Sequence, residues 1–399
     1  MSHSLTSFPM TRRRCIVATI LSVGAIDQPW SLAPLNGAEL RSAEKQKLLV
    51  RSQNPYNAEP DLEQLNRSYM TPVDAFYVRS HGSQPALSLK DYRLTIDGLV
   101  DQPKSLTVEE LTSRFTRVST TATLTCAGNR RTEFYAEKKV PGVAWEAGAI
   151  GNAEWSGVLL SDVLKSCGIQ PSAKHVWFEG LDEITVNDAK VSFGGSISLD
   201  LCNGEKNSPS QPLLVDRMNG KSLLPEHGFP LRTLVPGLIG ARSVKWLGKI
   251  TVSDKPSSNH YLARAYKVVT ENTPEKVAAA DPIYEYVTNS AICRVAMAAE
   301  KGVYELRGYA LAGGRPGNRI KTISVKCEQW KEWKDVEISS PVRDFCWVLW
   351  SAKLSLPPEA RSIQVRAIDE LGFTQPVRTP WNAHGYQYNG WHSVQLPQA

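Results

Sequence analysis

The amino-acid sequence predicts a mixed α+β region followed by an all-β sandwich. From Asn54 to about residue 275, strand-like runs alternate with a few segments of helical periodicity. From about residue 280 onward only short strand-like runs remain, and Gly and Pro separate them. The composition agrees, because 25 Pro, 27 Gly, 11 Trp and 13 Tyr favour turns and short strands over long helices.

The first region contains both element types. An alternating run at 91–100 predicts a strand, and Thr107 is a typical N-cap for a helix over 107–115. The β-branched run 118–126 predicts the next strand. Apolar residues at helical spacing in 159–169 predict a second helix that ends at Gly168. Further strand-like runs lie at 175–180, 231–237 and 244–252.

The second region follows a stretch, 271–282, whose composition is that of a linker. Five strand-like runs come after it, at 304–311, 320–327, 334–338, 346–354 and 362–369. Such spacing is typical of a β-sandwich. The sequence therefore predicts three parts: a targeting segment or disordered tail at 1–50, a mixed α+β domain at 51–275 and an all-β domain at 280–399.

Composition and charge exclude several classes of protein. The 399 residues are 42% hydrophobic and 22% charged, which excludes a collagen-like, coiled-coil or wholly disordered chain. The net charge is +6, but residues 1–50 hold six Lys/Arg against three Asp/Glu. The remaining residues are nearly balanced, which argues against a broad nucleic-acid-binding face.

The N-terminal segment has the features of a targeting signal. Three arginines, Arg12 to Arg14, precede a mostly apolar run at 15–26. This run is too short to cross a bilayer core of about 30 Å. The pattern fits a mitochondrial presequence and, loosely, a twin-arginine export signal, so the intermembrane space and a bacterial periplasm are both candidate locations. An unstructured tail is the alternative. No other stretch is long and apolar enough for an integral membrane segment.

One of the seven cysteines is a candidate metal ligand. An odd number of cysteines without a C-x-x-C pair disfavours a disulfide framework or a zinc ribbon. Cys126 ends a predicted strand, and the small residues 127–128 and the pair Arg130-Arg131 follow it. Guanidinium groups near a thiol stabilise the thiolate, which binds soft metals. A buried core cysteine beside a salt-bridged arginine pair is the alternative interpretation.

A second candidate site is the basic stretch 226–245, in which cationic side chains lie on glycine-rich turns. Such turns can direct both N–H groups and cations at one anion, although a solvated basic face is the alternative. The cations are His227, Arg232, Arg242 and Lys245. A third, weaker candidate is the segment FYVRSH, with Arg79 and His81.

Together these three segments resemble the sulfite oxidase family of molybdenum enzymes. CAGNRR at 126–131 is similar to the family's molybdenum-ligating motif, and residues 216–246 are similar to its cofactor-binding block. NPYNAEP and TPVDAFYVRSH resemble its N-terminal block. The resemblance extends from Asn54 to Val394 and is closest through Ile250. It implies a molybdopterin-binding α+β domain and a C-terminal immunoglobulin-like domain that forms a homodimer.

The resemblance also implies the site residues. Cys126 would ligate molybdenum beside one pterin dithiolene, in a molybdenum-molybdopterin cofactor. The cofactor would be held by Tyr77, Val78, Arg79, Ser80, His81, Asp182, His227, Arg232, Ser243, Val244 and Lys245. The residues expected around an anionic substrate are Tyr266, Arg79, Arg131, Trp145 and His384.

Two departures from the family pattern bear on the substrate. The family motif WNxRG reads Trp381-Asn382-Ala383-His384-Gly385 here, so a histidine replaces the usual arginine. A histidine of ordinary pKa, about 6.5, carries a conditional charge. Ser80 stands where Asn is usual.

The function implied is oxidation of sulfite to sulfate. The chain has neither His-Pro-Gly-Gly before residue 54 nor C-x-x-C-H, so no haem is expected, and electrons would pass to cytochrome c or dioxygen. A molybdenum reductase of nitrate or of S- or N-oxides is the alternative, and a cofactor-free binding module of the same fold is a second one.

Overall fold

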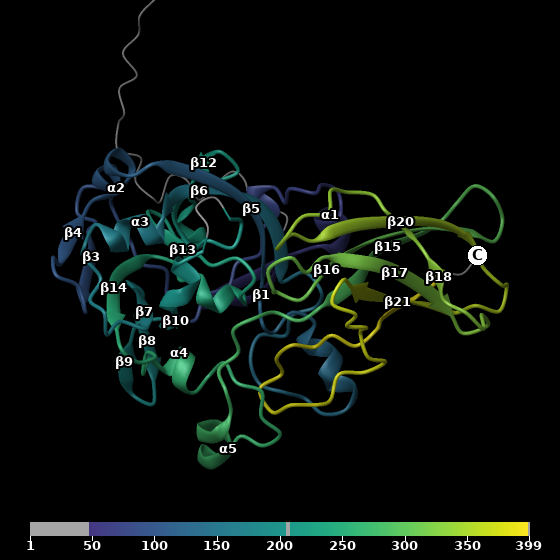
Figure 1. Ribbon diagram of the computed structural model, residues 1–399. Helices are drawn as coiled ribbons and strands as arrows, with labels where there is room; N and C mark the ends of the chain where they lie inside the picture. The colour runs from purple at the N-terminus through teal and green to yellow at the C-terminus, as the bar shows by residue number, and fades with distance from the viewer. Residues whose placement is uncertain (1–47, 205–207, 398–399) are drawn as a thin grey trace, which may run out of the picture. The chain divides into compact units, whose positions relative to one another are not determined.

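The computed structural model describes residues 48–204 and 208–397 (Figure 1). The predicted targeting segment lies outside the described residues, except that strand β1 (Leu48–Gln53) already begins within its last three positions. The described residues belong to one compact unit, so the predicted boundaries at 275 and 280 stay a prediction. Each helix in this part of the chain is too short to span a membrane.

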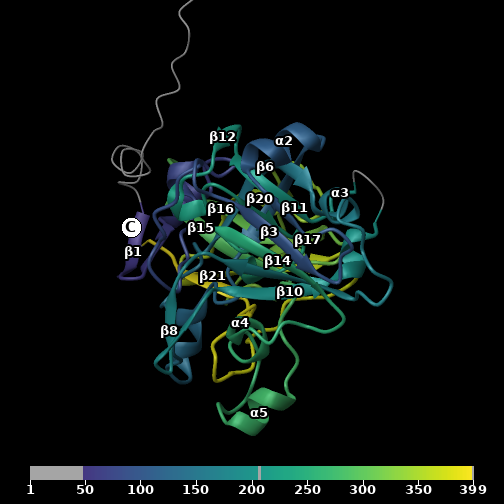
Figure 2. The ribbon, with the colours of Figure 1, turned by 90° about the vertical axis from the view of Figure 1, so that its left-hand side faces the viewer.

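The first region is built around two sheets. One has the strand order β10-β7-β14-β3-β4, and only its β14-β3 pair is parallel (Figure 2). The other has the order β12-β11-β6-β5, and β13 also pairs with β11. The bounds are β3 (Leu94–Gly98), β4 (Lys104–Leu106), β5 (Arg117–Thr125), β6 (Ile150–Leu159), β7 (His175–Gly180), β10 (Gly194–Ser198), β11 (Leu213–Met218), β12 (Lys221–Ser222), β13 (Arg232–Leu234) and β14 (Leu247–Ser253).

Two hairpins and short helices complete this region. Strand β1 pairs with β2 (Tyr56–Pro60), and β8 (Ile184–Val186) pairs with β9 (Ala189–Val191). The α-helices are α1 (Leu62–Leu65), α2 (Val108–Arg114), α3 (Leu160–Lys165), α4 (His260–Ala263) and α5 (Pro274–Ala279). The 3-10 helices are η2 (Val73–Ala75), η3 (Arg131–Ala136), η4 (Leu199–Cys202), η5 (Pro225–His227) and η6 (Gly240–Arg242).

Helix capping explains where two of the helices begin. In α2 the Thr107 hydroxyl accepts the N–H of Glu110 at 3.0 Å, and the Glu110 carboxylate accepts the N–H of Thr107 at 2.9 Å. This capping box confirms the predicted start of the helix. Helix α5 lies inside the stretch predicted as a linker. Thr273 caps it and Pro274 is its first residue, so local start signals made a helix where composition indicated none.

The second region is a sandwich of two four-stranded sheets, ordered β15-β16-β20-β19 and β18-β17-β21-β22. The bounds are β15 (Asn289–Met297), β16 (Val303–Leu311), β17 (Ile320–Cys327), β18 (Lys334–Asp335), β19 (Glu337–Ile338), β20 (Val348–Ser355), β21 (Ser362–Asp369) and β22 (His392–Gln395). Buried side chains of both sheets, such as Leu306 and Val365, form one apolar core between them. The predicted α+β region and all-β sandwich are confirmed. The run 334–338 is not one strand, because its two halves join different sheets.

Contacts between the first region and the sandwich fix the loop after Cys126. The Asn129 amide donates to the Tyr309 hydroxyl at 3.0 Å, and the Arg130 guanidinium donates to the Asn289 side chain at 2.7 Å. Both partners belong to sandwich strands. The loop after Cys126 is therefore held by hydrogen bonds to two neighbouring strands of the sandwich. The six described cysteines are buried free thiols.

Candidate active site

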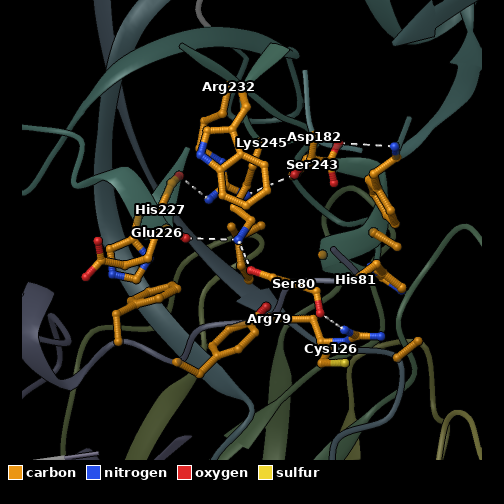
Figure 3. Close-up of a pocket in the computed structure, with 18 of the residues that line it drawn as sticks. Arg79, Ser80, His81, Cys126, Asp182, Glu226, His227, Arg232, Ser243 and Lys245 are labelled. Atoms are coloured by element: carbon orange, nitrogen blue, oxygen red, sulfur yellow. Dashed lines mark hydrogen bonds between the residues drawn. The ribbon is translucent and has the colours of Figure 1, made fainter. Parts of the chain in front are cut away.

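A cavity of about 670 Å³ lies at the C-terminal end of β5 (Figure 3). It draws its walls from the segments around residues 76–81, 124–127, 226–232 and 240–246, and from single residues of other loops. Figure 3 shows Cys126 and Arg79 on one side and Arg232 and Ser243 on the other. The sequence-predicted residues that line it are Tyr77, Arg79, Ser80, His81, Cys126, Asp182, His227, Arg232, Ser243, Lys245 and Tyr266.

Cys126 follows directly on the last residue of β5. Its backbone N–H donates to the Ala149 carbonyl at 2.9 Å, which fixes the position of the residue. The N–H of Gly128 lies 3.4 Å from the sulfur and can donate to it. The cavity thus contains a sulfur that is placed to bind a soft metal.

Arg232, on β13, brings a buried positive charge to the cavity wall. Its guanidinium donates to the carbonyls of His227 and Ser243, both at 2.9 Å, and lies over the Trp155 ring. Within the described residues no carboxylate pairs with it. Burial lowers the pKa of Arg232 to about 10. Carbonyl dipoles alone compensate the charge, so an anion in the cavity would be bound strongly.

Lys245 connects two segments that are far apart in the sequence. Its ammonium group donates to the Ser80 hydroxyl at 3.0 Å and to the Glu226 carbonyl at 2.9 Å. Gly228 lies next to it with a φ of 106°, and a Cβ there would come within 3.1 Å of the side chains of Arg232 and Lys245. Glycine at this turn therefore lets the two cationic side chains lie near each other.

Arg79 and Ser80 are held by one asparagine. The side-chain oxygen of Asn57, on β2, accepts from the Arg79 guanidinium at 3.2 Å and from the Ser80 N–H at 2.9 Å. Arg79 also donates to the Ser80 carbonyl. These bonds orient the Arg79 side chain at the cavity wall.

Two buried titratable groups of the cavity form a pair. The Tyr266 hydroxyl lies 3.0 Å from Nε2 of His81, whose ring packs against Phe193 and Tyr261. Burial, with the charge of Arg79, holds the pKa of His81 well below its usual range. Burial raises the pKa of Tyr266 well above its usual value. The phenol therefore keeps its proton, and the imidazole that is hydrogen-bonded to it is neutral.

Asp182 is a buried acid in this wall. It accepts the N–H of Phe193 at 3.1 Å, and burial raises its pKa. The side chain thus ties the segment before β10 to the cavity.

Two predicted cofactor residues do not line the cavity. The side chains of Val78 and Val244 are buried in the core. The N–H and carbonyl of Val78 pair with Ala58, and those of Val244 pair with Thr233. Their role in cofactor binding stays a prediction.

Three predicted substrate residues also lie outside the cavity lining. The Arg131 guanidinium donates to the carbonyls of Gly385 at 2.9 Å and Val143 at 3.1 Å. Trp145 is fully buried, and its indole N–H has no partner among the described residues. His384 is half-buried, and burial lowers its pKa. The roles of Arg131, Trp145 and His384 stay predictions.

Sequence reasoning missed several lining residues. Three of them lie next to a predicted residue in the chain: Phe76, Glu226 and Trp246. This proximity in the sequence could have identified them as lining residues. Phe193 comes from the loop before β10, and no local pattern marks it.

These features fit an anionic organic cofactor that carries a soft metal. Arg232 and Lys245 supply positive charge, and Cys126 supplies a sulfur ligand. One buried cation without a carboxylate partner and one thiol facing the same space are the donor set that such a cofactor requires.

Comparisons with known proteins agree with this donor set. Residues 81–261 match the family model described as oxidoreductase molybdopterin binding domain, and residues 280–399 match the Mo-co oxidoreductase dimerisation domain. In its fold the chain is similar to the sulfane dehydrogenase of Paracoccus pantotrophus, with a TM-score of 0.73 and 25% identity. This match covers 94% of this chain and 96% of that chain.

Curated relatives give the same assignment. The mitochondrial sulfite oxidase of Drosophila melanogaster is 34% identical over 93% of this chain and 65% of its own length. The sulfite oxidase of Arabidopsis thaliana is 34% identical over 88% of this chain and 93% of its own length. An NADH nitrate reductase of Solanum lycopersicum is 32% identical over 87% of this chain and 40% of its own length. The chain thus spans about two thirds of the Drosophila relative and nearly all of the Arabidopsis relative. It belongs to the sulfite oxidase family of molybdopterin-dependent oxidoreductases.

Proposed function

We propose that this protein oxidises sulfite to sulfate and passes the electrons to an external acceptor, either cytochrome c or dioxygen. The observation that carries the proposal is the convergence of the Cys126 thiol with the cations Arg79, Arg232 and Lys245 on one cavity. Membership of the sulfite oxidase family supports it. The overall reaction converts sulfite and water into sulfate, two protons and two electrons.

The residues of the cavity divide into two groups. Arg232, Ser243, Lys245 and His227 would hold the phosphate and polar groups of a pterin cofactor, because they present cations and polar groups on one wall. Cys126 would bind the metal as a thiolate. When bound, this cofactor supplies the oxygen transfer and the two-electron redox chemistry.

The protein's own contribution is to bind and orient an anion. Sulfite is an anion at neutral pH, and Arg79 gives the cavity a cation held in one direction by Asn57. Tyr266 keeps its proton and can donate to a substrate oxygen, while neutral His81 holds the phenol in place from its other side. Fixed donors of this kind stabilise charge without reorganising during the reaction.

A reductase of nitrate or of S- or N-oxides is the second candidate. His384 favours it, because this position usually carries arginine in the family and burial lowers the pKa of the histidine. The similarity to a nitrate reductase also favours it. We further propose a homodimer, which the match of residues 280–399 to the dimerisation model supports.

Steady-state assays of the molybdenum-loaded enzyme separate the two candidates. Sulfite is supplied with ferricyanide, cytochrome c or dioxygen as acceptor, and nitrate is supplied with a reduced viologen. We expect sulfite-dependent reduction of at least one acceptor. Nitrate reduction without sulfite oxidation would reject the proposal and favour the reductase.

The metal-ligand assignment is tested with Cys126→Ser. Serine is a poor ligand for a soft metal, so sulfite turnover should fall by more than about 100-fold, more than the loss of an outer-shell partner causes. Cys167→Ser is the matched control, because Cys167 is equally buried and its thiol donates to the Val163 carbonyl, away from the cavity. Turnover per bound molybdenum should stay unchanged in this control. Retained turnover in the Cys126 variant would contradict thiolate ligation.

A further inference from the structure

Tyr386 contacts Tyr266 and Arg131, two residues that the family resemblance places around the substrate. Its ring stacks on that of Tyr266, with centroids 5.1 Å apart and planes 19° from parallel. The Arg131 guanidinium carbon lies 5.0 Å from the centroid of the Tyr386 ring. One aromatic ring therefore links a phenol of the cavity wall to a buried cation.

The backbone around Tyr386 is fixed close to the candidate metal ligand. The Asn382 side chain accepts the N–H of Tyr386 at 3.1 Å and donates to its carbonyl at 2.9 Å. The N–H of Gln387 donates at 2.7 Å to the carbonyl of Ala127, the residue after Cys126. The ring is thus held by a loop that is hydrogen-bonded to the Cys126 segment.

The Arg131 guanidinium is closely confined by its neighbours, and the Tyr386 ring packs against it. A Cβ on Gly128 would come within 2.6 Å of its guanidinium nitrogens, and one on Gly142 within 2.5 Å. Its guanidinium donates to backbone carbonyls, and within residues 48–204 and 208–397 no carboxylate pairs with it. The charge of Arg131 is therefore available to an anion, and its direction depends on what packs against it.

His384, where the family usually has arginine, supplies no fixed charge here. Its ring nitrogens lie 2.9 Å from the Lys267 carbonyl and 3.1 Å from the Asn272 side-chain oxygen. Burial lowers its pKa, so the ring is neutral near pH 7. The ring meets Tyr386 edge-on, with centroids 6.0 Å apart. With a neutral residue at this position, substrate binding depends more on the cations that remain.

We propose that Tyr386 is a positioning residue for the anionic substrate, whose ring sets the placement of Arg131 and Tyr266 relative to each other. The proposal rests on the proposed function, since Arg131 and Tyr266 are substrate residues only if a small oxyanion is the substrate. The proposal assigns the role to the ring, through its contacts with Tyr266 and Arg131, and not to the hydroxyl, which also interacts with Arg131.

The test compares three variants of the molybdenum-loaded enzyme: Tyr386→Leu, Tyr386→Met and Tyr386→Phe. The readouts are KM and kcat for sulfite and the Kd of sulfate measured by titration calorimetry, which needs no turnover. We expect Leu and Met to raise both the sulfite KM and the sulfate Kd about tenfold, equivalent to about 1.4 kcal/mol. The kcat should change much less. The Phe variant keeps the ring, so its constants should stay near those of the wild type.

Tyr388→Leu is the matched control. Arg130 lies over the Tyr388 ring at 5.1 Å, in the same kind of arginine–tyrosine contact two residues further on, but Glu133 pairs with the charge of Arg130. This variant should lower the thermal midpoint and leave the sulfite KM and the sulfate Kd unchanged.

Four outcomes would overturn the proposal. These are unchanged KM and Kd in both the Leu and Met variants, a tenfold loss in the Phe variant, an equal loss in the Tyr388 control, or a loss of fold in Leu and Met alike. Failure of the function proposal is a separate result. A wild-type enzyme that does not oxidise sulfite would reject that function, while the sulfate titration would still decide the role of Tyr386.

Discussion

Arg130 and Arg232 are both buried arginines, at 0% and 5% exposure. Of the two, Arg130 is paired with a carboxylate and Arg232 is not, within the described residues. Arg130 donates to both carboxylate oxygens of Glu133, at 2.5 and 2.7 Å. Arg232 donates only to backbone carbonyls. Burial acts to lower the pKa of both. At Arg130 the charge of Glu133 outweighs it and the pKa is raised, whereas at Arg232 the pKa falls to about 10.

The difference in pairing distinguishes an arginine that stabilises the fold from an arginine that is placed to bind a ligand. A buried charge without an opposite charge lowers the free energy of unfolding, so its presence requires a reason other than stability. Arg130 joins the loop after Cys126 to the sandwich, and its charge is neutralised on site. Arg232 faces a cavity, where an anionic ligand would neutralise it.

The largest effect is expected from Arg232→Met. Removing the cation should lower the affinity for the cofactor by about 1,000-fold, which is about 4 kcal/mol, so little molybdenum should be bound per purified chain. The thermal midpoint of the cofactor-free chain should stay the same or rise, because a buried charge without a carboxylate partner has been removed. Metal analysis and thermal unfolding measure the two quantities.

Arg232→Lys is the control for charge alone. Lysine keeps the charge but cannot donate to the His227 and Ser243 carbonyls in the same fork geometry. An intermediate molybdenum content is expected. Full molybdenum content in the Met variant would mean that Arg232 belongs to the scaffold after all.

A smaller effect of opposite kind is expected from Arg130→Met. The change leaves Glu133 without its partner and breaks the bond to Asn289, so the free energy of unfolding should fall by about 3 kcal/mol. Molybdenum-loaded enzyme that folds should bind sulfate as the wild type does. The double variant Arg130→Met with Glu133→Gln should recover part of the loss, and chemical denaturation measures all three chains.

A double variant as unstable as Arg130→Met alone would show that the ion pair is not the cause. A loss of molybdenum as large as that in the Arg232 variant would remove the distinction between the two arginines.

Local periodicity in the sequence predicted strands well. The sequence predicted poorly which distant segments contact each other in the folded chain. The run 362–369 alternates between half-buried and buried positions, so the strand β21 followed from pattern alone. Segment 334–338 was predicted as one strand, since no local pattern shows that its halves join different sheets.

The candidate site shows the same limit. The cations of 226–245 were found because they cluster along the chain. The contact of Tyr386 with Arg131 and Tyr266 joins three distant segments, so only the folded structure reveals it. Likewise, Arg130 and Arg131 are neighbours of identical type, and the sequence could not tell which of them a carboxylate would neutralise.

The smallest expected effect extends the comparison to a buried histidine beside the Arg130–Glu133 pair. Nδ1 of His392 accepts the N–H of Ile292 at 3.1 Å. Burial, with the charge of Arg130, lowers the pKa of His392 to about 4. Because the His392 ring stays neutral in the folded chain near pH 7, it adds no second positive charge next to Arg130.

The pH dependence of stability follows from this lowered pKa. Above about pH 6.5 the ring is neutral in both the folded and the unfolded chain, so its contribution to stability is complete. As the pH falls from about 6.5 toward 4, the unfolded chain takes up a proton that the folded chain does not, and the free energy of unfolding should fall by about 2 kcal/mol.

The variant His392→Gln isolates this contribution. Glutamine stays uncharged and still offers an oxygen to the Ile292 N–H, so the variant should match the wild type at pH 7.5 and lose less stability by pH 4.5. Thermal midpoints measured across this range give both slopes. Equal slopes would show that His392 takes up its proton equally in both states. In that case Glu133 alone would compensate the positive charge of Arg130, and the contrast with Arg232 would depend on this one carboxylate.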